Sequence, residues 1–287
     1  MDNLKKLPAE AIKDYEPYAN GVAALHVPKT GIVNYKVISA AYANIFSKRW
    51  GGEIYLNHKV TGIKSKLGHC EVITPSKTFE TRMMINTAGL YSDKVANMAG
   101  IPIDVRIIPF RGEYYDVVKT KQFLVKNLIY PVPDPAFPFL GVHFTRRIDG
   151  GIDAGPNAVF AFKREGYKKT DFSFSETLDS LSWRGFQKVM FKYWKIGLGE
   201  YYRSFNKAEF ARSLKSLVPS IEKEDLMQGG AGVRAQACTR DGLLINDFVI
   251  YERPSMIHVL NTPSPAATSS LSIGKTILQL IEKNIRL

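Results

Sequence analysis

The sequence is poor in the features that mark several classes of protein. It has two cysteines, Cys70 and Cys238, which are too few and too far apart for a disulfide framework or a cysteine-based metal site. We expect both to be free buried thiols, and we expect no metal. No run approaches the roughly 20 apolar residues of a membrane-spanning helix, and the first ten residues lack the apolar core of a signal peptide. These absences predict a cytoplasmic protein, with membrane association left open.

Acidic residues are also scarce relative to basic ones, 27 against 39, so the net charge is +12. Basic residues occur at Lys163-Arg164 and Lys168-Lys169, and from Lys188 to Lys207 they are interleaved with aromatic residues. Such a mixture can contact nucleic acid or an anionic membrane, but no helix-turn-helix, zinc-finger or RNP-type pattern accompanies it. We therefore predict a basic solvated face or a field that attracts an acidic substrate. No nucleic-acid partner is expected, and a peripheral membrane contact is the alternative.

The order of the predicted elements suggests an interrupted domain. An apolar stripe from Val37 to Trp50 predicts a helix, and residues 53–82 predict a small antiparallel meander. From residue 105 short runs of alternating, aromatic or β-branched residues are separated by Gly and Pro, which predicts an antiparallel sheet. Separate strands are predicted at 105–109 and 113–118. Helices follow at about 178–195 and 207–217, with Gly197 and Gly199 as a break. We predict a nucleotide-binding domain, 1–104 and 227–287, interrupted by a substrate domain, 105–226.

Two strands are each followed by a turn of small residues and a helix. The first strand runs from Met83 to Asn86, and the second from Met256 to Leu260. A helix start offers free backbone N–H groups and partial positive charge, which favour an anion or an electron-rich carbonyl. Two such turns suggest one ligand that lies across both strand ends. The alternative is a pair of ordinary turns that only pack, with Ser264 as a helix cap.

Several motifs carry a resemblance to a known family. They are Glu16-Pro17, Pro28-Lys-Thr-Gly-Ile-Val33, Ile85-Asn-Thr-Ala-Gly-Leu-Tyr-Ser-Asp93, Pro109-Phe-Arg-Gly-Glu-Tyr-Tyr115, Val142-His-Phe-Thr145, Gly155-Pro-Asn-Ala158, Gly232-Val-Arg-Ala-Gln236 and Ser264-Pro-Ala-Ala-Thr268. With them the chain resembles FAD-dependent oxidoreductases of the D-amino-acid oxidase class over almost its whole length. Within that class it is most similar to L-2-hydroxyglutarate dehydrogenases and oxidases. Many flavoproteins share the run Asn-Thr-Ala-Gly. The runs Pro109-Phe-Arg-Gly-Glu-Tyr-Tyr115 and Ser264-Pro-Ala-Ala-Thr268 point to the hydroxyglutarate group.

The chain departs from the family pattern in one respect. The family begins with a strand, a Gly-x-Gly-x-x-Gly turn and a helix that hold the FAD diphosphate. Gly51-Gly52 and Gly229-Gly230 lack that spacing and setting. The expected fold is therefore mixed α/β and α+β: a Rossmann-like FAD-binding domain, truncated at its N-terminus, interrupted by an antiparallel-sheet substrate domain. Whether this chain alone binds FAD and is active stays open.

The resemblance implies which residues contact FAD. Val60 is expected near the adenine through its backbone, and the second turn is expected at the pyrimidine end of the isoalloxazine. Hydride that reaches the flavin leaves negative charge there, which a helix N-terminus stabilises. The cofactor-binding residues implied are Val60, Thr87, Ala88, Gly89, Ser264, Pro265, Ala266, Ala267 and Thr268.

The substrate residues are also implied by the resemblance. Arg234 matches the position at which related oxidases clamp the substrate carboxylate, which a guanidinium can do with two hydrogen bonds; the alternative is a surface ion pair. Arg111 and Tyr114 are weaker candidates for the same pocket. A dicarboxylate needs a second cation, which Arg111 or Arg146 can supply; the alternative for both is structural packing at a sheet edge.

Oxidation of a 2-hydroxy acid needs a base that takes the hydroxyl proton while hydride leaves the α-carbon. We choose His143 because it lies in a matching motif of the substrate domain; the alternative is a structural histidine. His258 lies in a strand beside the second turn and is expected to pack. The function predicted is oxidation of an L-2-hydroxyglutarate-like 2-hydroxy acid to the 2-oxo acid. The alternatives are an amino-acid oxidase of the same class and a non-catalytic binding module; the oligomeric state stays open.

Overall fold

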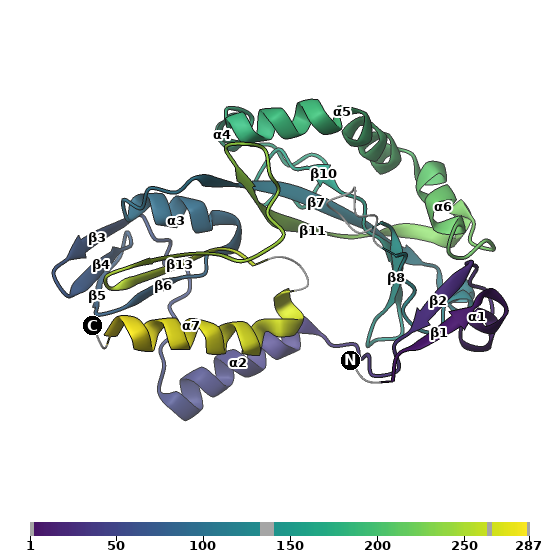
Figure 1. The fold of residues 1–287 in the computed structure, drawn as a ribbon, viewed down its shortest axis with the longest axis horizontal. Coiled ribbons are helices and arrows are strands. Elements are labelled where there is room, and N and C mark those ends of the chain that lie inside the picture. The colour runs from purple at the N-terminus through teal and green to yellow at the C-terminus, as the bar shows by residue number, and fades with distance from the viewer. Residues whose placement is uncertain (1–2, 133–140, 263–265, 286–287) are drawn as a thin grey trace. The chain divides into compact units, whose positions relative to one another are not determined.

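The computed structural model describes residues 3–132, 141–262 and 266–285 (Figure 1). Its internal contacts divide the chain into two compact units, each built from three separate segments. The first unit comprises Met1–Tyr42, Arg111–Val159 and Trp194–Gly232; the second comprises Ala43–Phe110, Phe160–Tyr193 and Val233–Leu287. The predicted domain boundaries, after residues 104 and 226, stay a prediction.

The first unit contains a small hairpin, part of a larger sheet, and helices. Its complete elements are β1 (Lys5–Pro8), α1 (Ala9–Tyr15), β2 (Ala23–His26), 3-10 helix η2 (Lys119–Leu124), β8 (His143–Arg146), β9 (Ile152–Gly155), α6 (Lys207–Lys215) and 3-10 helix η3 (Lys223–Asp225). Strands β1 and β2 pair antiparallel, and so do β8 and β9.

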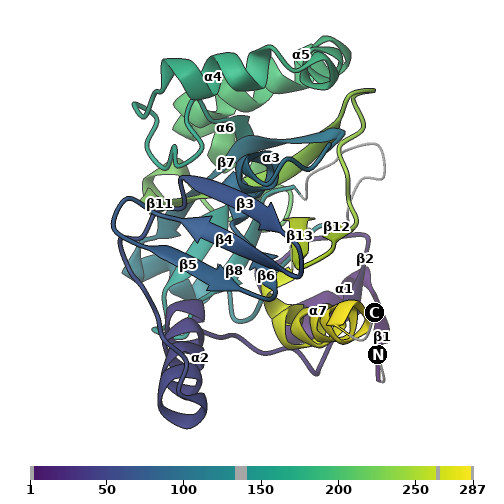
Figure 2. The ribbon, with the colours of Figure 1, turned by 90° about the vertical axis from the view of Figure 1, so that its left-hand side faces the viewer.

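The second unit contains two three-stranded sheets with the strand orders β3-β4-β5 and β12-β13-β6; the first of these is seen in Figure 2. Its complete elements are β3 (Gly62–Lys66), β4 (His69–Ile73), β5 (Thr78–Thr81), β6 (Met84–Asn86), η1 (Gly89–Tyr91), α3 (Ser92–Met98), α4 (Phe174–Leu181), β12 (Val249–Arg253), β13 (Met256–Asn261), η4 (Ala266–Ser269) and α7 (Ser270–Ile285).

Five elements contribute residues to both units because the unit boundaries fall inside them. They are α2 (Tyr35–Trp50), β7 (Val105–Val117), β10 (Val159–Phe160), α5 (Arg184–Phe205) and β11 (Leu226–Thr239). In the larger sheet the strand order is β10-β7-β9-β8, and β11 pairs with β7. The antiparallel sheet and the mixed α/β class predicted from the sequence are confirmed.

The core of the first unit lies between one face of this sheet and α6. Asn206 caps α6, since its Oδ1 accepts hydrogen bonds from the backbone N–H groups of Ala208 and Glu209. The apolar side chains at three- and four-residue intervals in α6 then face the sheet. The buried cluster consists of Val117, Leu124, Val125, Val142, Phe144, Ile152, Ala154, Phe210, Ala211, Leu214, Val218, Ile221 and Leu226.

The core of the second unit surrounds β13, of which all six residues are buried. A strand covered on both faces reads as a continuous apolar run, which is why Met256–Leu260 was recognisable in the sequence. One cluster on it joins Leu260 with buried residues of α3, β7 and β11. A second joins Met256 with Ile63 and Cys70. Both cysteines are free and buried, as predicted.

Three local predictions need correction or qualification. The glycines at 197 and 199 do not break a helix: α5 is kinked at Tyr193, whose backbone is not helical (φ −113°, ψ 19°), and then continues through both glycines to Phe205. Each glycine costs only about 1 kcal/mol relative to alanine. The two strands expected at 105–118 are one strand, β7. The predicted helix α2 is present, but its apolar stripe is not packed, since no residue of α2 is buried.

Candidate functional site

The two strand–turn–helix segments of the second unit meet at one sheet edge. Strand β13 pairs with β6 in parallel, with Met256 opposite Met84 and His258 opposite Asn86. Parallel strands end at the same edge of a sheet, so the chain leaves both strands on the same side. The structure therefore places the turn Thr87–Gly89 at the same sheet edge as Asn261, the last residue of β13. Ser264 and Pro265 lie outside the described residues.

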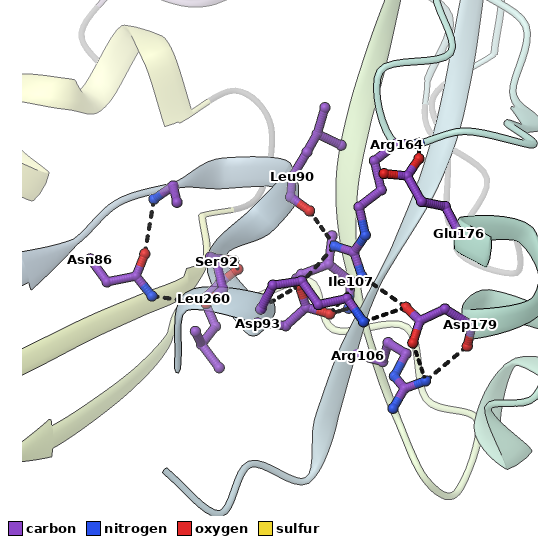
Figure 3. Close-up of polar contacts among 12 residues, drawn as sticks. Asn86, Leu90, Ser92, Asp93, Arg106, Ile107, Arg164, Glu176, Asp179 and Leu260 are labelled. Carbon is purple, nitrogen blue, oxygen red and sulfur yellow. Dashed lines mark hydrogen bonds and ion pairs between the residues drawn. The ribbon is translucent and has the colours of Figure 1, made fainter. Parts of the chain in front are cut away.

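The buried side chain of Asn86 holds the first turn in place. Its Oδ1 accepts the backbone N–H of Ala88 (3.1 Å), and its Nδ2 donates to the carbonyl of Ser92 (2.8 Å) and to Nδ1 of His258 (3.1 Å). Ser92 Oγ donates to the Leu260 carbonyl (3.0 Å). Figure 3 shows Asn86 and Ser92 between the two segments. These bonds join the turn after β6 to the strand that precedes the second turn.

His258 is a fully buried neutral ring in this network. Because its Nδ1 accepts from Asn86, its proton resides on Nε2. Burial lowers the pKa of His258, and the charge of Arg253 lowers it further. Among the described residues no hydrogen-bond partner is found for Nε2. The prediction that His258 packs inside the protein is confirmed.

A buried ion cluster supports the same turn from its other side. The guanidinium of Arg164, 1% exposed, pairs with Asp93 at 2.7 and 2.9 Å and also donates to the Leu90 carbonyl. Asp93 Oδ2 accepts the backbone N–H of Ile107 in β7 (3.2 Å), and Arg164 reaches Asp179 in α4 (3.2 Å). The cluster thus connects η1, α3, β7 and α4 of the second unit (Figure 3).

The charges in this cluster stabilise one another. Burial opposes the charged form of Arg164, but hydrogen bonds and charge from Asp93 and Asp179 prevail and raise its pKa. Burial also opposes the charge of Asp179, while Lys94, Arg106 and Arg164 together hold the pKa of its carboxyl below the ordinary value. The raised pKa of Arg164 and the lowered pKa of Asp179 therefore both favour the ionised pair.

Sequence reasoning missed this cluster because it assigned Lys163-Arg164 to a solvated basic face. For Arg164 that prediction was wrong. Asp93 stood at the end of a quoted motif, but its partner lies 71 residues further along the chain, and no spacing rule connects the two. The one available signal was the carboxylate of Asp93, which stands in a segment of mainly apolar and small residues. A carboxylate that is buried in such a segment needs a partner.

The turn Thr87–Gly89 can accept a ligand at close range. All three residues are exposed, and Gly89 has a φ of +54°, in the left-handed region that favours glycine. A Cβ built on Gly89 would meet no atom within 4 Å, so there is open space beside the backbone. At the second turn, Ala267 and Thr268 are exposed in η4, directly before the 16-residue helix α7. These features fit the flavin contacts that the sequence predicts.

Val60 also lies in the second unit, where its half-buried side chain packs against the cluster of Ile63, Cys70 and Met256. The side chain thus contacts the core of this unit. The predicted contact between this backbone and the adenine stays a prediction.

In the first unit, His143 and Tyr114 lie on one face of the sheet. His143 of β8 is opposite Gly155 of β9, and a Cβ on Gly155 would lie 3.3 Å from the Tyr114 ring. Directly opposed residues share a face, so both side chains lie on the face of Gly155. The neighbouring positions, Phe144 and Ala154, belong to the core on the opposite face. Sequence reasoning placed His143 and Tyr114 in one site, and the structure brings them onto adjoining parts of one sheet face.

The orientation of the His143 ring is set by its neighbours. Its Nδ1 lies 3.0 Å from the Gly141 carbonyl oxygen, and its ring stacks on Tyr130 with centroids 4.2 Å apart. A carbonyl only accepts, so Nδ1 donates, and Nε2 is then the basic nitrogen of the neutral imidazole. This tautomer is the one that a general base at Nε2 requires.

Arg111 lies on the opposite face of β7 from Tyr114 by strand alternation. It is 3% exposed and donates from Nε (2.9 Å) and its terminal nitrogen (2.8 Å) to Glu113 Oε1. The other oxygen of Glu113 accepts from Ser204 of α5 (2.6 Å) and from Asn157 (3.1 Å). These contacts favour the packing alternative for Arg111, and its substrate role stays a prediction.

The other two arginines lie elsewhere. Arg146 donates to the Val125 carbonyl (2.9 Å), beside the core of the first unit. Arg234 is half-buried in the part of β11 that belongs to the second unit. Their substrate roles likewise stay predictions. Within residues 3–132, 141–262 and 266–285 there is no group of three or more His, Cys, Asp or Glu residues that could hold a metal ion. The same residues include no helix long and apolar enough to cross a membrane.

Comparison with known proteins gives concordant matches. Residues 1–280 match the family described as FAD dependent oxidoreductase. The chain is 57% identical over 280 residues to the L-2-hydroxyglutarate dehydrogenase of Indibacter alkaliphilus, covering 97% of this chain and 70% of that protein. It is 43% identical over 277 residues to the protein of the same name from Escherichia coli K12, covering 96% and 65%. The chain therefore spans 65 to 70% of the length of these relatives.

Solved structures agree on the fold. L-α-glycerophosphate oxidase from Mycoplasma pneumoniae, with FAD bound, superposes with a TM-score of 0.72 at 20% identity over 98% of this chain and 65% of that one. Glycine oxidase from Geobacillus kaustophilus superposes with a TM-score of 0.67 at 17% identity over 98% and 64%. At such identities the likeness concerns the fold alone.

Proposed function

The chain belongs to the family of FAD-dependent oxidoreductases, which confirms the resemblance read from its motifs, and from this premise we propose that it acts as an L-2-hydroxyglutarate dehydrogenase. The reaction is the FAD-dependent oxidation of the 2-hydroxy acid to the 2-oxo acid. The observation that carries the proposal is the 57% identity to a protein of that name over 97% of the chain.

Residues of the second unit would hold the cofactor. Thr87, Ala88 and Gly89 offer an exposed turn with open space beside Gly89, and Ala266–Thr268 precede the N-terminus of α7. The free N–H groups and the dipole of that helix start stabilise negative charge. FAD, when bound, supplies the acceptor for the hydride that leaves the α-carbon of the substrate. Negative charge that develops near the helix start is then partly neutralised.

Other residues would bind the substrate and move its proton. Arg234 offers a guanidinium that can hold a carboxylate through two hydrogen bonds and so orient the α-carbon. His143 would accept the hydroxyl proton at Nε2, since its Nδ1 already donates to Gly141. Tyr114, beside His143 on the same sheet face, would donate a hydrogen bond to the substrate. For a second carboxylate, Arg111 would need to reach beyond its bonds to Glu113.

An absorption spectrum tests the proposal directly. The purified chain is mixed with FAD, unbound flavin is removed, and L-2-hydroxyglutarate is added without oxygen. The expected result is a bound flavin spectrum that L-2-hydroxyglutarate bleaches and its D-enantiomer does not. A colourless protein, or bound flavin that this substrate leaves oxidised, would contradict the proposed activity of this chain. Bleaching by amino acids instead would identify the amino-acid oxidase alternative.

If the spectrum has the expected form, steady-state kinetics can distinguish the proposed role of His143 as the base from that of Arg234 as the carboxylate-binding residue. His143→Gln should lower kcat by roughly a hundredfold or more with little change in KM, since general-base catalysis contributes about that factor. Arg234→Lys should mainly raise KM, because one of the two carboxylate bonds is lost. Equal effects of both substitutions on KM alone would remove His143 from the role of base.

A further inference from the structure

Tyr130 covers one face of the His143 ring. The two ring centroids are 4.2 Å apart and the ring planes differ by 21°, so the imidazole and the phenol are stacked. Tyr130 is 47% exposed, whereas His143 is buried at 8% exposure. The more exposed phenol thus shields this face of the imidazole from solvent.

The backbone places Tyr130 opposite His143. Ile129 and Phe144 form an antiparallel bridge in which each backbone N–H donates to the carbonyl of the other residue, at 3.0 and 2.9 Å. In this register the next pair is Tyr130 with His143, a pair without hydrogen bonds, in which side chains approach closely. Ile129 packs against the core of the first unit. Tyr130 therefore lies on the opposite face, which His143 shares.

The hydroxyl group of Tyr130 is held by strand β8. It lies 3.1 Å from Thr145 Oγ1, within hydrogen-bond distance. Thr145 follows His143 by two residues in β8, so both side chains lie on the same face of the sheet. The Tyr130 ring is thus fixed at its hydroxyl end by one residue of β8, while its face covers another.

The segment before Tyr130 is held by Glu16, the first residue of the Glu16-Pro17 motif. The buried carboxylate of Glu16 accepts hydrogen bonds from the backbone N–H groups of Lys126 (2.9 Å) and Asn127 (2.5 Å) and from the side-chain amide of Asn127 (2.9 Å). Hydrogen bonds to an ionised carboxylate are among the stronger ones in proteins. All of these residues belong to the first unit. The segment that carries Tyr130 is therefore held both before and at its pairing with β8.

The stacked ring supplies a constraint that the hydrogen bond at Nδ1 lacks. The bond to the Gly141 carbonyl fixes one atom of the His143 imidazole, and a ring that is held at one atom can still pivot. The stack on Tyr130 fixes the plane of the ring, so that Nε2 keeps one direction. We propose that Tyr130 is a positioning residue for His143 in the oxidation of the 2-hydroxy acid. This inference rests on the proposed function, in which His143 is the base.

The position of His143 matters at the moment of proton transfer. The hydroxyl proton of the substrate passes to Nε2, the α-hydrogen leaves with its electron pair to FAD, and the carbon–oxygen double bond forms. A base must lie within hydrogen-bond reach of the proton, and an error of about 1 Å can cost roughly a hundredfold in rate. The imidazolium that results lies over the face of the Tyr130 ring, which attracts a cation. Loss of Tyr130 should therefore lower kcat rather than raise KM.

Steady-state kinetics of the FAD-loaded chain with L-2-hydroxyglutarate test the proposal. Tyr130→Leu should lower kcat by roughly tenfold and change KM by less than about twofold. Tyr130→Phe keeps the ring and loses only the hydroxyl group, so it should retain most of the activity. Tyr18→Leu is the matched control and should leave kcat and KM unchanged. Tyr18 is 40% exposed in the same unit and also contacts another ring, that of Phe123.

¹⁵N NMR of the histidine side chains tests the position of His143 without FAD or substrate. The spectra are recorded at a pH about two units above the ordinary histidine pKa of about 6.5, and the signals of His143 are assigned by their absence from His143→Gln. The wild-type chain should carry the proton on Nδ1 alone. In Tyr130→Leu both tautomers should appear, whereas Tyr130→Phe and Tyr18→Leu should keep the single one.

The proposal is overturned if His143 keeps a single tautomer in Tyr130→Leu, or if this substitution raises KM and leaves kcat unchanged. It is also overturned if Tyr130→Phe is as harmful as Tyr130→Leu, since the ring would then not be the group that positions His143. A wild-type chain that does not oxidise L-2-hydroxyglutarate would contradict the proposed function. In that case the NMR spectra alone would decide whether Tyr130 positions His143.

Discussion

The turn after β6 and the turn after β13 arise from the same sequence pattern, but the helices that follow them differ in burial. The first turn rests on Asn86, on Ser92 and on the ion pair between Asp93 and Arg164, all of which are buried. The helix that follows it, α3, buries Ser92, Asp93 and Ala96. The second turn leads into α7, of which none of residues 270–284 is buried.

This contrast shows that a strand–turn–helix pattern in the sequence predicts the secondary structure but does not predict which contacts stabilise it. The first turn is fixed by polar partners from distant segments, among them residue 164, which is 71 residues away from Asp93. Residues 263–265 of the second turn lie outside the described residues, and the helix that follows this turn, α7, has no buried residue between 270 and 284. The buried groups around the first turn should therefore contribute more to the stability of the folded chain than the exposed side chains of α7.

Removal of Arg164 should have the largest effect. Arg164→Met leaves the buried Asp93 carboxylate without its counter-ion, and the free energy of unfolding should fall by about 3–5 kcal/mol. Urea unfolding followed by circular dichroism measures this change. Combining Arg164→Met with Asp93→Leu should recover most of the loss, since the unpaired charge is then absent.

Arg240→Met is the control for this experiment, because Arg240 is exposed and lies over the Trp183 ring at 4.6 Å. A cation–π contact at such a site contributes about 0.5–1 kcal/mol. If Arg164→Met were no more harmful than Arg240→Met, the ion cluster would not anchor the first turn.

Loss of the Asn86 amide should have the next largest effect. Asn86→Ala removes three hydrogen bonds and leaves the Ser92 carbonyl without this donor. We expect the free energy of unfolding to fall by about 2 kcal/mol, in the range found for buried groups that lose a partner. Asn97→Ala, at an exposed position of α3, should change it by less than about 0.5 kcal/mol. Comparable losses in the two variants would contradict the role of Asn86 as the centre of the network.

His258 should make the anchoring of the first turn sensitive to pH. Its pKa is lowered in the folded protein, so between the folded and unfolded pKa values the unfolded chain binds more protons. Stability should therefore decrease as the pH falls below the ordinary histidine pKa of about 6.5. In His258→Gln this part of the pH dependence should be absent, whereas His69→Gln, at the β3–β4 turn, should retain it. Identical pH profiles for wild type and His258→Gln would exclude this histidine as the cause.

The smallest effect is expected in α7. Leu278 is 52% exposed, and Leu278→Ser should change the free energy of unfolding by less than about 0.5 kcal/mol, as is usual for surface substitutions. The same urea titration measures it. A loss above about 1.5 kcal/mol would show that α7 is packed and would weaken the contrast between the two turns.

Much of the fold could be predicted because it follows from the local spacing of apolar residues and from the residues that end helices and strands, such as Gly and Pro. The apolar run of β13, the small turn after β6 and the helix α2 were all recognised in this way. The class of the fold followed from the change to alternating strands after residue 105. The motif-based resemblance added the family, which single-sequence periodicity could not supply.

The sequence-based predictions were wrong where contacts with residues far away in the sequence determine the structure. The continuation of α5 through Gly197 and Gly199 depends on Glu200 and Ser204, which bind Ala158 and Glu113. The burial of Arg164 depends on Asp93 and Asp179. Whether the apolar stripe of α2 is buried depends on what packs against it. The helical period of apolar residues in the sequence is the same for a stripe that faces the core and for one that is exposed.

We propose that the exposed turn after β6 contacts the flavin, and FAD titration of two threonine variants tests this contact most directly. Thr87 in that turn and Thr78 in β5 are both exposed residues of the second unit. Glutamate at position 87 places a negative charge beside the anionic cofactor, so Thr87→Glu should weaken FAD binding by roughly tenfold or more, while Thr78→Glu should bind as the wild type does. Equal FAD affinity in the two variants, or no FAD binding by the wild-type chain, would contradict the account.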